Sequence, residues 1–127
     1  DRAKMAQQVF GDDIAREQLE AIIHPRVRAR WKMKISEWRE RQIHAGVVVI
    51  PLLFEVEVQD QFDVVLCVAC TANTQQVRLR HRKWDEEQIS ARNASQMDIA
   101  EKMDLADHVL WTEGDIKVTL EQVSRIF

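Results

Sequence analysis

The spacing of apolar and polar positions first predicts two short helices near the start of the chain. These helices cover residues 2–10 and 13–23, with Gly11 between them, and the second has Ile14, Leu19, Ile22 and Ile23 at helical spacing. Asp12 or Asp13 is the expected N-cap of the second helix, because a short acidic side chain accepts hydrogen bonds from the unpaired N–H groups of a first helical turn.

A longer amphipathic helix is predicted next. Pro25 suits its first position, where a missing N–H costs nothing, and Gly46 suits its C-terminal stop. Its apolar stripe consists of Val27, Trp31, Ile35 and Trp38. Between positions 26 and 44, seven Lys and Arg residues stand against two Glu residues, a net charge of +5. We interpret this charge either as a solvated outer face or as a landing site for a phosphorylated small molecule. Nucleic acid fits less well, because the rest of the chain is acidic.

Runs that are apolar at successive positions predict strands covered on both faces. Such runs occupy residues 47–50 and 62–70, and "HVLW" at 108–111 predicts a short third strand. Further helices are predicted to begin near residues 71–74 and to span 85–97, 98–107 and 115–127. Strands that alternate with helices in this way indicate an α/β fold with a parallel sheet and helical insertions.

Length and composition are those of one globular domain. The chain has 127 residues, 46% hydrophobic and 31% charged, with a net charge of −3, so no global field draws it to nucleic acid or membrane. Because it begins with Asp1 instead of Met and its predicted sheet is thin, we expect it to be the later part of a longer protein. No apolar run approaches the length of a membrane span.

The two cysteines, Cys67 and Cys70, cannot form a disulfide framework, which favours a reducing, cytoplasmic setting. We interpret them as small buried side chains, with a redox or zinc site as the alternative. The four histidines are scattered without ligand spacing, so no metal site built by the protein is predicted.

Three arginines mark the helical excursion between the second and third predicted strands. Arg78 and Arg82 lie four positions apart, hence on one face of a helix, and Arg92 follows. The forked N–H donors of arginine match phosphate oxygens two at a time, so these residues predict a phosphate clamp. The alternative is a solvated helical face whose ion-pair partners are Asp85 and the two glutamates after it.

The segment "VVVIPLLFE", residues 47–55, ends an apolar run on a carboxylate. Ligands of open α/β sheets gather outside the carboxyl ends of parallel strands. We therefore expect Leu53 and Phe54 to close over the apolar part of a ligand and Glu55 to orient a polar group. The alternative is a buried strand followed by a turn, with Glu55 as a local cap.

Four segments together resemble the dephospho-coenzyme A kinases. They are "LEAIIHPRVRARW", "VVVIPLLFE", "QQVRLRHRKWDEEQISARNASQM" and "EKMDLADHVL", in the order and near the spacing of that family. The resemblance implies a P-loop nucleoside-kinase-like fold, three α/β/α layers around a parallel sheet with a helical substrate domain and a helical lid, here without the first strand and the P-loop. It also implies transfer of the γ-phosphate of ATP to the 3′-hydroxyl of dephospho-coenzyme A, the last step of coenzyme A synthesis.

The resemblance further implies which parts and residues act. The helical substrate part would be residues 1–45, the core 46–76 and 103–127, and the lid 77–102. ATP would be held by Arg78, Arg82, Arg92, Thr112 and Gly114, the three arginines being the catalytic groups. Dephospho-coenzyme A would be held by His24, Leu53, Phe54, Glu55 and Gln96. Mg²⁺ would accompany ATP, with its ligands in the part of the protein that precedes this chain.

The chain also departs from the family pattern. The family's Gly-Lys-Ser/Thr loop and the Asp that follows it are absent, so we expect this polypeptide alone to transfer no phosphate. Thr112 stands where the family usually has Asn near the adenine, and Lys83 and Trp84 replace an Asp-Gly pair in the lid. The competing hypothesis is a non-catalytic module that binds nucleotide or coenzyme A. Neither nucleic acid nor membrane is a predicted partner, and no oligomeric state is predicted.

Overall fold

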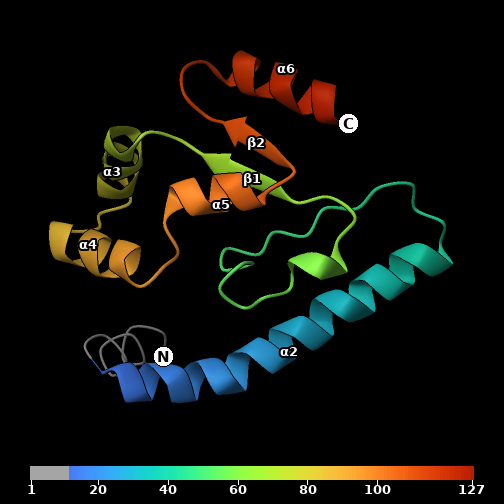
Figure 1. Ribbon diagram of the computed structural model, residues 1–127, viewed down its shortest axis with the longest axis horizontal. Coiled ribbons are helices and arrows are strands. Elements are labelled where there is room, and N and C mark those ends of the chain that lie inside the picture. The colour runs from blue at the N-terminus through green and yellow to red at the C-terminus, as the bar shows by residue number, and fades with distance from the viewer. Residues whose placement is uncertain (1–11) are drawn as a thin grey trace. The chain divides into compact units, whose positions relative to one another are not determined.

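The computed structural model describes residues 12–127 (Figure 1). The chain divides into two compact units, Asp1–Val49 and Ile50–Phe127. The helix that the sequence predicts over residues 2–10 lies outside the described residues. None of the helices among those residues combines the length and the apolar content that crossing a bilayer requires.

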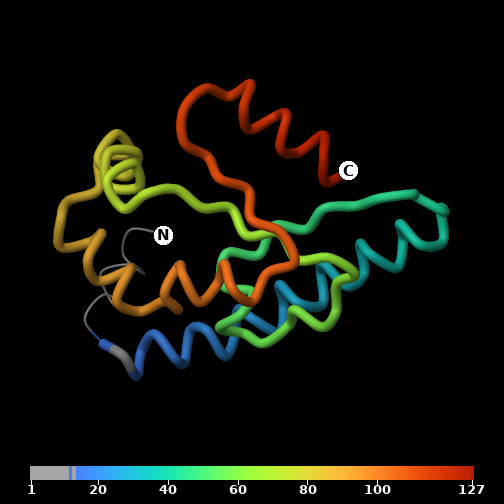
Figure 2. Tube along the Cα trace, turned by 45° about the horizontal axis from the view of Figure 1, so that its top comes forward, coloured from blue at the N-terminus to red at the C-terminus, as the bar shows by residue number. Residues whose placement is uncertain are grey.

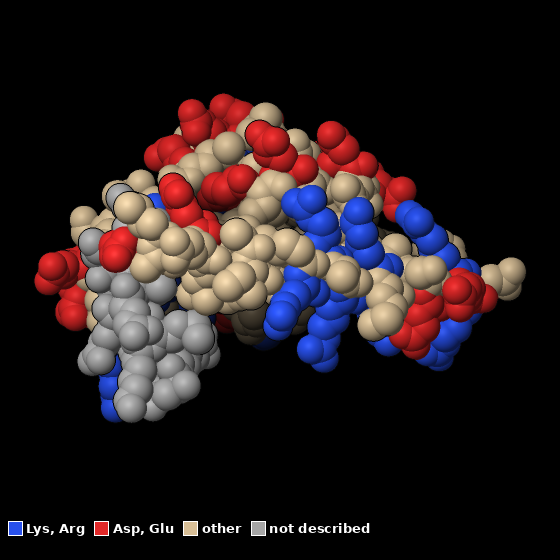
Figure 3. Space-filling view, turned by 90° about the horizontal axis from the view of Figure 1, so that it is seen from below, with Lys and Arg blue, Asp and Glu red and all other residues tan. Residues whose placement is uncertain are grey.

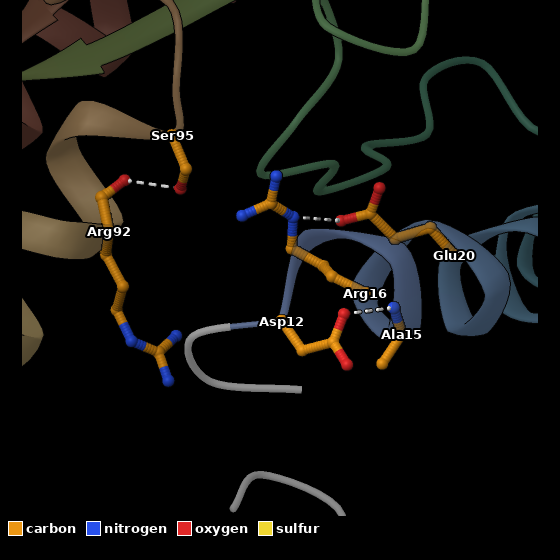
Figure 4. A network of polar contacts seen from close by, with 6 residues as sticks. All are labelled: Asp12, Ala15, Arg16, Glu20, Arg92 and Ser95. Carbon is orange, nitrogen blue, oxygen red and sulfur yellow. Dashed lines mark hydrogen bonds and ion pairs between the residues drawn. The ribbon is translucent and has the colours of Figure 1, made fainter. Parts of the chain in front are cut away.

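The first unit contains one long helix, α2, from Asp13 to Glu40. Asp12 caps it as predicted, because its Oδ1 accepts a hydrogen bond from the N–H of Ala15 at 3.0 Å (Figure 4). The predicted break at Pro25 is wrong, since α2 continues through this residue. Proline removes one N–H from the helical ladder at a cost of about 3 kcal/mol, and the turns on both sides of it hold the helix together.

The C-terminus of α2 is formed by Gln42, not by Gly46 as predicted. Gln42 takes a left-handed φ of 52°, and its N–H donates to the carbonyl of Arg39 at 3.0 Å. The N–H of Ile43 donates to the carbonyl of Trp38 at 2.9 Å. This pair of bonds satisfies the last carbonyls of the helix, which a left-handed residue just beyond the helix makes possible.

Gly46 has a packing role instead. A Cβ atom placed on it would lie 2.5 Å from Cε3 of Trp38, too close for real atoms. Replacing Gly46 with alanine should therefore lower the free energy of unfolding by about 1–3 kcal/mol, because the loop must move away from the indole ring. Guanidinium unfolding followed by tryptophan fluorescence measures this loss. In a Trp38→Leu background the loss should shrink, and an undiminished loss there would contradict the steric explanation.

The second unit is built on a two-stranded parallel sheet (Figure 1). Strand β1 spans Leu66–Ala69 and strand β2 spans His108–Trp111, with Leu66 opposite His108 and Ala69 opposite Trp111. The third predicted strand is thus confirmed at its predicted bounds, and the strand predicted over 62–70 is confirmed in its second half. Asp107 fixes the start of the pairing, since its Oδ2 accepts the N–H of Val65 at 2.7 Å.

The strand predicted over 47–50 is absent, because its residues join no ladder in the described part of the chain. Val47 and Val49 are 68% and 87% exposed. β-branched residues favour extended backbone, but a strand needs a neighbouring chain that accepts and donates its hydrogen bonds. The expectation that the second strand is covered on both faces is also wrong for the described residues, since Val68 in β1 is 59% exposed.

Four helices complete the second unit. They are α3 (Ala72–His81), α4 (Glu86–Ala94), α5 (Ile99–Leu105) and α6 (Ile116–Ile126), and a short 3-10 helix, η1 (Gln59–Gln61), precedes β1. Each of the four begins where a side-chain oxygen accepts a first-turn N–H. The caps are Thr71, Asp85, Asp98 and Asp115. Helix α5 packs on β1 and α6 on β2 (Figure 2).

The core of this unit is small. Its buried apolar residues are Phe54, Val58, Cys67, Ala69, Ile89 and Leu110. The prediction of a buried small side chain at Cys67 is confirmed, and burial raises the pKa of its thiol. A raised pKa keeps the thiol protonated and unreactive, which suits a packing role.

Candidate functional site

Two loops leave the sheet at the same edge, where β1 and β2 both end. Thr71 follows β1 and begins α3, and Glu113 follows β2. Glu113 accepts the N–H of Thr71 on Oε1 at 2.6 Å and the hydroxyl of Thr74 on Oε2 at 2.9 Å. The hydrogen bonds from Thr71 and Thr74 lower the pKa of Glu113. A carboxylate at this helix N-terminus therefore fastens the second loop to α3.

Arg78 and Thr112, both predicted to hold ATP, contact each other. Nη1 of Arg78 donates to Oγ1 of Thr112 at 2.9 Å, and Nη2 donates to the carbonyl of Thr112 at 2.5 Å. The Thr112 hydroxyl donates in turn to the carbonyl of Ala69, the last residue of β1, at 3.0 Å. Gly114, which follows in the same loop, adopts a left-handed φ of 78°. The structure thus gathers these predicted nucleotide residues at the carboxyl edge of the sheet.

Arg82 and Lys83 close the end of α3. Arg82 lies one position past the last helical residue, and Lys83 has a left-handed φ of 63°. The N–H of Lys83 donates to the carbonyl of Arg80 at 2.8 Å, and the N–H of Trp84 donates to that of Leu79 at 3.2 Å. Lys83 therefore takes the conformation that glycine usually supplies after a helix, and the unusual Lys83–Trp84 pair still makes a tight turn.

Arg92 lies on α4, and its guanidinium stacks on the indole of Trp84, 4.2 Å from the ring centroid. The carbonyl of Arg92 accepts a hydrogen bond from the hydroxyl of Ser95 at 3.0 Å (Figure 4). Two contacts join α4 to α3. Arg80 pairs with Glu86, and the amide of Asn93 donates to that of Gln75 at 3.2 Å. These contacts position Arg92 relative to the helix that carries Arg78.

Glu55 is tied to the segment in which the predicted lid ends. Its Oε1 accepts the N–H of Met97 at 3.1 Å and the ammonium of Lys102 at 2.6 Å. Burial raises the pKa of Glu55, but hydrogen bonds from Lys102 and Met97 outweigh it and hold the pKa below its usual value. Its other oxygen, Oε2, is buried and finds no hydrogen-bond donor within residues 12–127. Glu55 therefore stays ionised, and its predicted contact with the acceptor stays a prediction.

The other residues predicted to hold the acceptor on this side differ in their burial. Residues 51–57 form consecutive turns, closed by hydrogen bonds such as that from the N–H of Val56 to the carbonyl of Leu52 at 3.0 Å. Phe54 is buried in the core, and Leu53 is half-buried. Gln96 is exposed, just before Met97. The turns, not the end of a strand, carry the "PLLFE" residues.

The remaining predicted residue, His24, lies in the first unit on α2. It borders an open surface hollow of about 450 Å³ along this helix, together with Glu20 one turn before it and Arg28 and Lys32 after it. Lys and Arg side chains gather over the C-terminal half of α2 (Figure 3). Positive charge along this face suits an anionic ligand.

Sequence reasoning missed three residues of the site. Trp84 supports Arg92, Lys102 pairs with Glu55, and Glu113 accepts hydrogen bonds from the start of α3. Trp84 could have been found, because an aromatic residue eight positions from an arginine in a turn-and-helix segment can reach it. The other two depend on contacts across about forty positions, for which one sequence carries no signal.

Among residues 12–127, no three His, Cys, Asp or Glu side chains lie close enough to hold a metal ion. The predicted location of the Mg²⁺ ligands, in the part of the protein that precedes this chain, stays a prediction.

A protein-family comparison identifies the relatives of this chain. The family model described as Dephospho-CoA kinase matches residues 1–117. A dephospho-CoA kinase of Bdellovibrio bacteriovorus is 40% identical over 126 residues, which are 99% of this chain and 63% of the relative. One of Corynebacterium jeikeium is 38% identical over 123 residues, which are 96% of this chain and 63% of the relative. The chain thus spans somewhat less than two thirds of these relatives.

A solved structure shares the fold. The crystal structure of TT1252 from Thermus thermophilus superposes with a TM-score of 0.78 at 31% sequence identity, over 99% of this chain and 64% of that one. This likeness confirms the predicted fold class, an α/β arrangement around a parallel sheet.

Proposed function

Because the chain belongs to the dephospho-CoA kinase family, we propose that its protein transfers the γ-phosphate of ATP to the 3′-hydroxyl of dephospho-coenzyme A. This reaction would complete coenzyme A synthesis. The observation that carries the proposal is the match of the family model over residues 1–117.

The geometry at the carboxyl edge of the sheet supports the proposal. Phosphoryl transfer depends on positioning and on cations that neutralise charge on the transferred group. Arg78 is fixed beside the loop after β2, and Arg92 is stacked on Trp84 in the helical excursion after β1. Arg82, between them, adds a third guanidinium. We propose that these arginines contact the phosphates of ATP.

We propose that the parts of the chain have the roles that the resemblance implies. Residues 1–45 would bind the acceptor, with His24 and the basic face of α2 near its phosphates. Residues 77–102 would be the lid, and residues 46–76 and 103–127 the core. Glu55, Leu53, Phe54 and Gln96 would serve the acceptor side. The last residues of the proposed lid belong to α5, which packs on β1, so the moving part would end before this helix.

We propose that the 127-residue chain alone transfers no phosphate, because its sequence contains no Gly-Lys-Ser or Gly-Lys-Thr segment. A chain with the arginine cluster and without such a loop could still bind nucleotide or coenzyme A, which is the second candidate function. The low cysteine content keeps the cytoplasm as the proposed location.

A direct assay tests the proposal. The full-length protein, incubated with ATP and dephospho-coenzyme A, should form coenzyme A and ADP in equal amounts. Coenzyme A itself is the matched control, because its 3′-position already carries a phosphate and should accept none. ADP formation that is equal with both compounds would contradict the proposed acceptor. Binding of both ligands without any transfer would favour the non-catalytic module.

A further inference from the structure

Both oxygen atoms of Thr112 already take part in hydrogen bonds within the protein. Its hydroxyl donates to the carbonyl of Ala69 at 3.0 Å and accepts from Nη1 of Arg78 at 2.9 Å. Its carbonyl accepts from Nη2 of Arg78 at 2.5 Å. A hydroxyl has one proton to donate, and here that proton is directed to Ala69. The backbone N–H of Thr112 also donates to the carbonyl of Ala69, at 2.8 Å. Thr112 therefore has no donor left for a ring nitrogen of adenine.

The same contacts orient Arg78. Two of its N–H groups reach two atoms of one residue, which fixes the plane of the guanidinium as a carboxylate would. Within residues 12–127 its other N–H donors make no hydrogen bond and remain for a ligand, and the side chain is exposed. Arg78 can thus bind a phosphate while Thr112 holds it.

A second contact holds the loop after β2 in place against α3. Glu113, the residue after Thr112, accepts from Thr71 and Thr74 in the first turn of α3, the helix that carries Arg78. The loop after β2 is thus attached to α3 at two points, about one helical turn apart. This arrangement limits the movement of Arg78 relative to the edge of the sheet.

We propose that Thr112 is a positioning residue that directs the guanidinium of Arg78 to the phosphates of a bound nucleotide and does not read the base. The proposal rests on the proposed kinase function, in which Arg78 contacts those phosphates. It replaces the adenine-side role that the resemblance implies for this position.

Calorimetric titration of the full-length protein with ATP and with inosine triphosphate tests the proposal. The two nucleotides share the phosphates and differ at the base. Thr112→Val should weaken binding of both by the same factor, about tenfold, because a hydrogen bond to a charged group is lost. Thr112→Ser restores the hydroxyl and should recover most of that affinity. In an Arg78→Met background, Thr112→Val should cause no further loss.

A base-selective effect would overturn the proposal. If Thr112→Val weakened ATP binding and left inosine triphosphate binding unchanged, Thr112 would read the base. Losses that add up in the double variant would also overturn it, because Thr112 would then act independently of Arg78. Thr112→Ala is a second hydroxyl-free variant if valine disturbs folding. Equal losses for both nucleotides without any phosphoryl transfer would refute the proposed function and support this inference.

Discussion

Arg92→Ala should lower the proposed phosphoryl transfer by about 10²–10³-fold, since a guanidinium directed at developing phosphate charge contributes roughly that much. The fold should be little affected. Arg92 is exposed, and its stacking on Trp84 is worth about 0.5–1 kcal/mol at a surface site. Ile89, which anchors α4 in the core, is untouched by the substitution. Steady-state rates with saturating ATP and acceptor, together with thermal unfolding, measure both effects.

The matched control for Arg92 is Arg125→Ala, which removes the same side chain from the last turn of α6. This control should keep the rate of the unchanged protein. Trp84→Leu removes the surface on which the guanidinium of Arg92 stacks and should cause a smaller loss of rate than Arg92→Ala. Turnover of Arg92→Ala at the unchanged rate would refute the assignment of Arg92 to the lid.

Glu55→Ala should lower the free energy of unfolding by about 2–3 kcal/mol. The Lys102 side chain is 13% exposed and the Glu55 side chain 20%, so the substitution leaves a largely buried ammonium without its carboxylate. Loss of one partner of a fully buried pair costs about 3–5 kcal/mol, and the residual solvent contact of this pair reduces that figure. Urea unfolding measures the effect, with Asp104→Ala on the exposed side of α5 as the control.

The same pair predicts a dependence of stability on pH. The pKa of Glu55 is lowered from its usual 4.5, so the unfolded chain binds a proton more readily than the folded one. The stabilisation is therefore present above about pH 4.5 and is lost as the pH falls through the folded-state pKa. Between pH 6 and pH 3 the unchanged protein should lose more stability than Glu55→Gln, which does not titrate there. Parallel losses would contradict a lowered pKa at this site.

Enzyme kinetics separates this structural role of Glu55 from its proposed role on the acceptor side. If Glu55 contacts the acceptor, Glu55→Ala should raise the KM for dephospho-coenzyme A more than the KM for ATP. Equal changes in both constants would count against that contact, and would leave Glu55 as the residue that anchors Met97 and Lys102.

The predictions that agree with the structure depend on neighbouring residues. Helix starts such as Asp12 and Thr71 were predictable, because a cap needs only a short polar side chain and the N–H groups of the next turn. Strand β2 was predictable from three successive apolar residues, Val109 to Trp111, which lie between a polar turn and Thr112. The kinase family could also be identified from the sequence, because the resemblance rests on short segments that occur in the same order as in that family.

The wrong predictions concern helix continuation, strand pairing and packing contacts, which a local sequence pattern does not determine. Pro25 suits a helix start, but in α2 it lies inside a helix whose other turns offset its missing hydrogen bond. Val47 and Val49 have the right side chains for a strand, but pairing needs a second chain segment at the correct distance. Gly46 is the residue type that usually follows a helix, but here it lies against the ring of Trp38.

The sequence alone determined where several helices begin, the approximate positions of β1 and β2, the residue types of the candidate site and the family. Only the tertiary structure decided which of these residues meet: Arg78 with Thr112 across 34 positions, and Glu55 with Met97 across 42. The physical reason is that caps and helical periods involve residues only three or four positions apart along the chain. A contact between distant segments exists only after the whole unit has folded and brought them together.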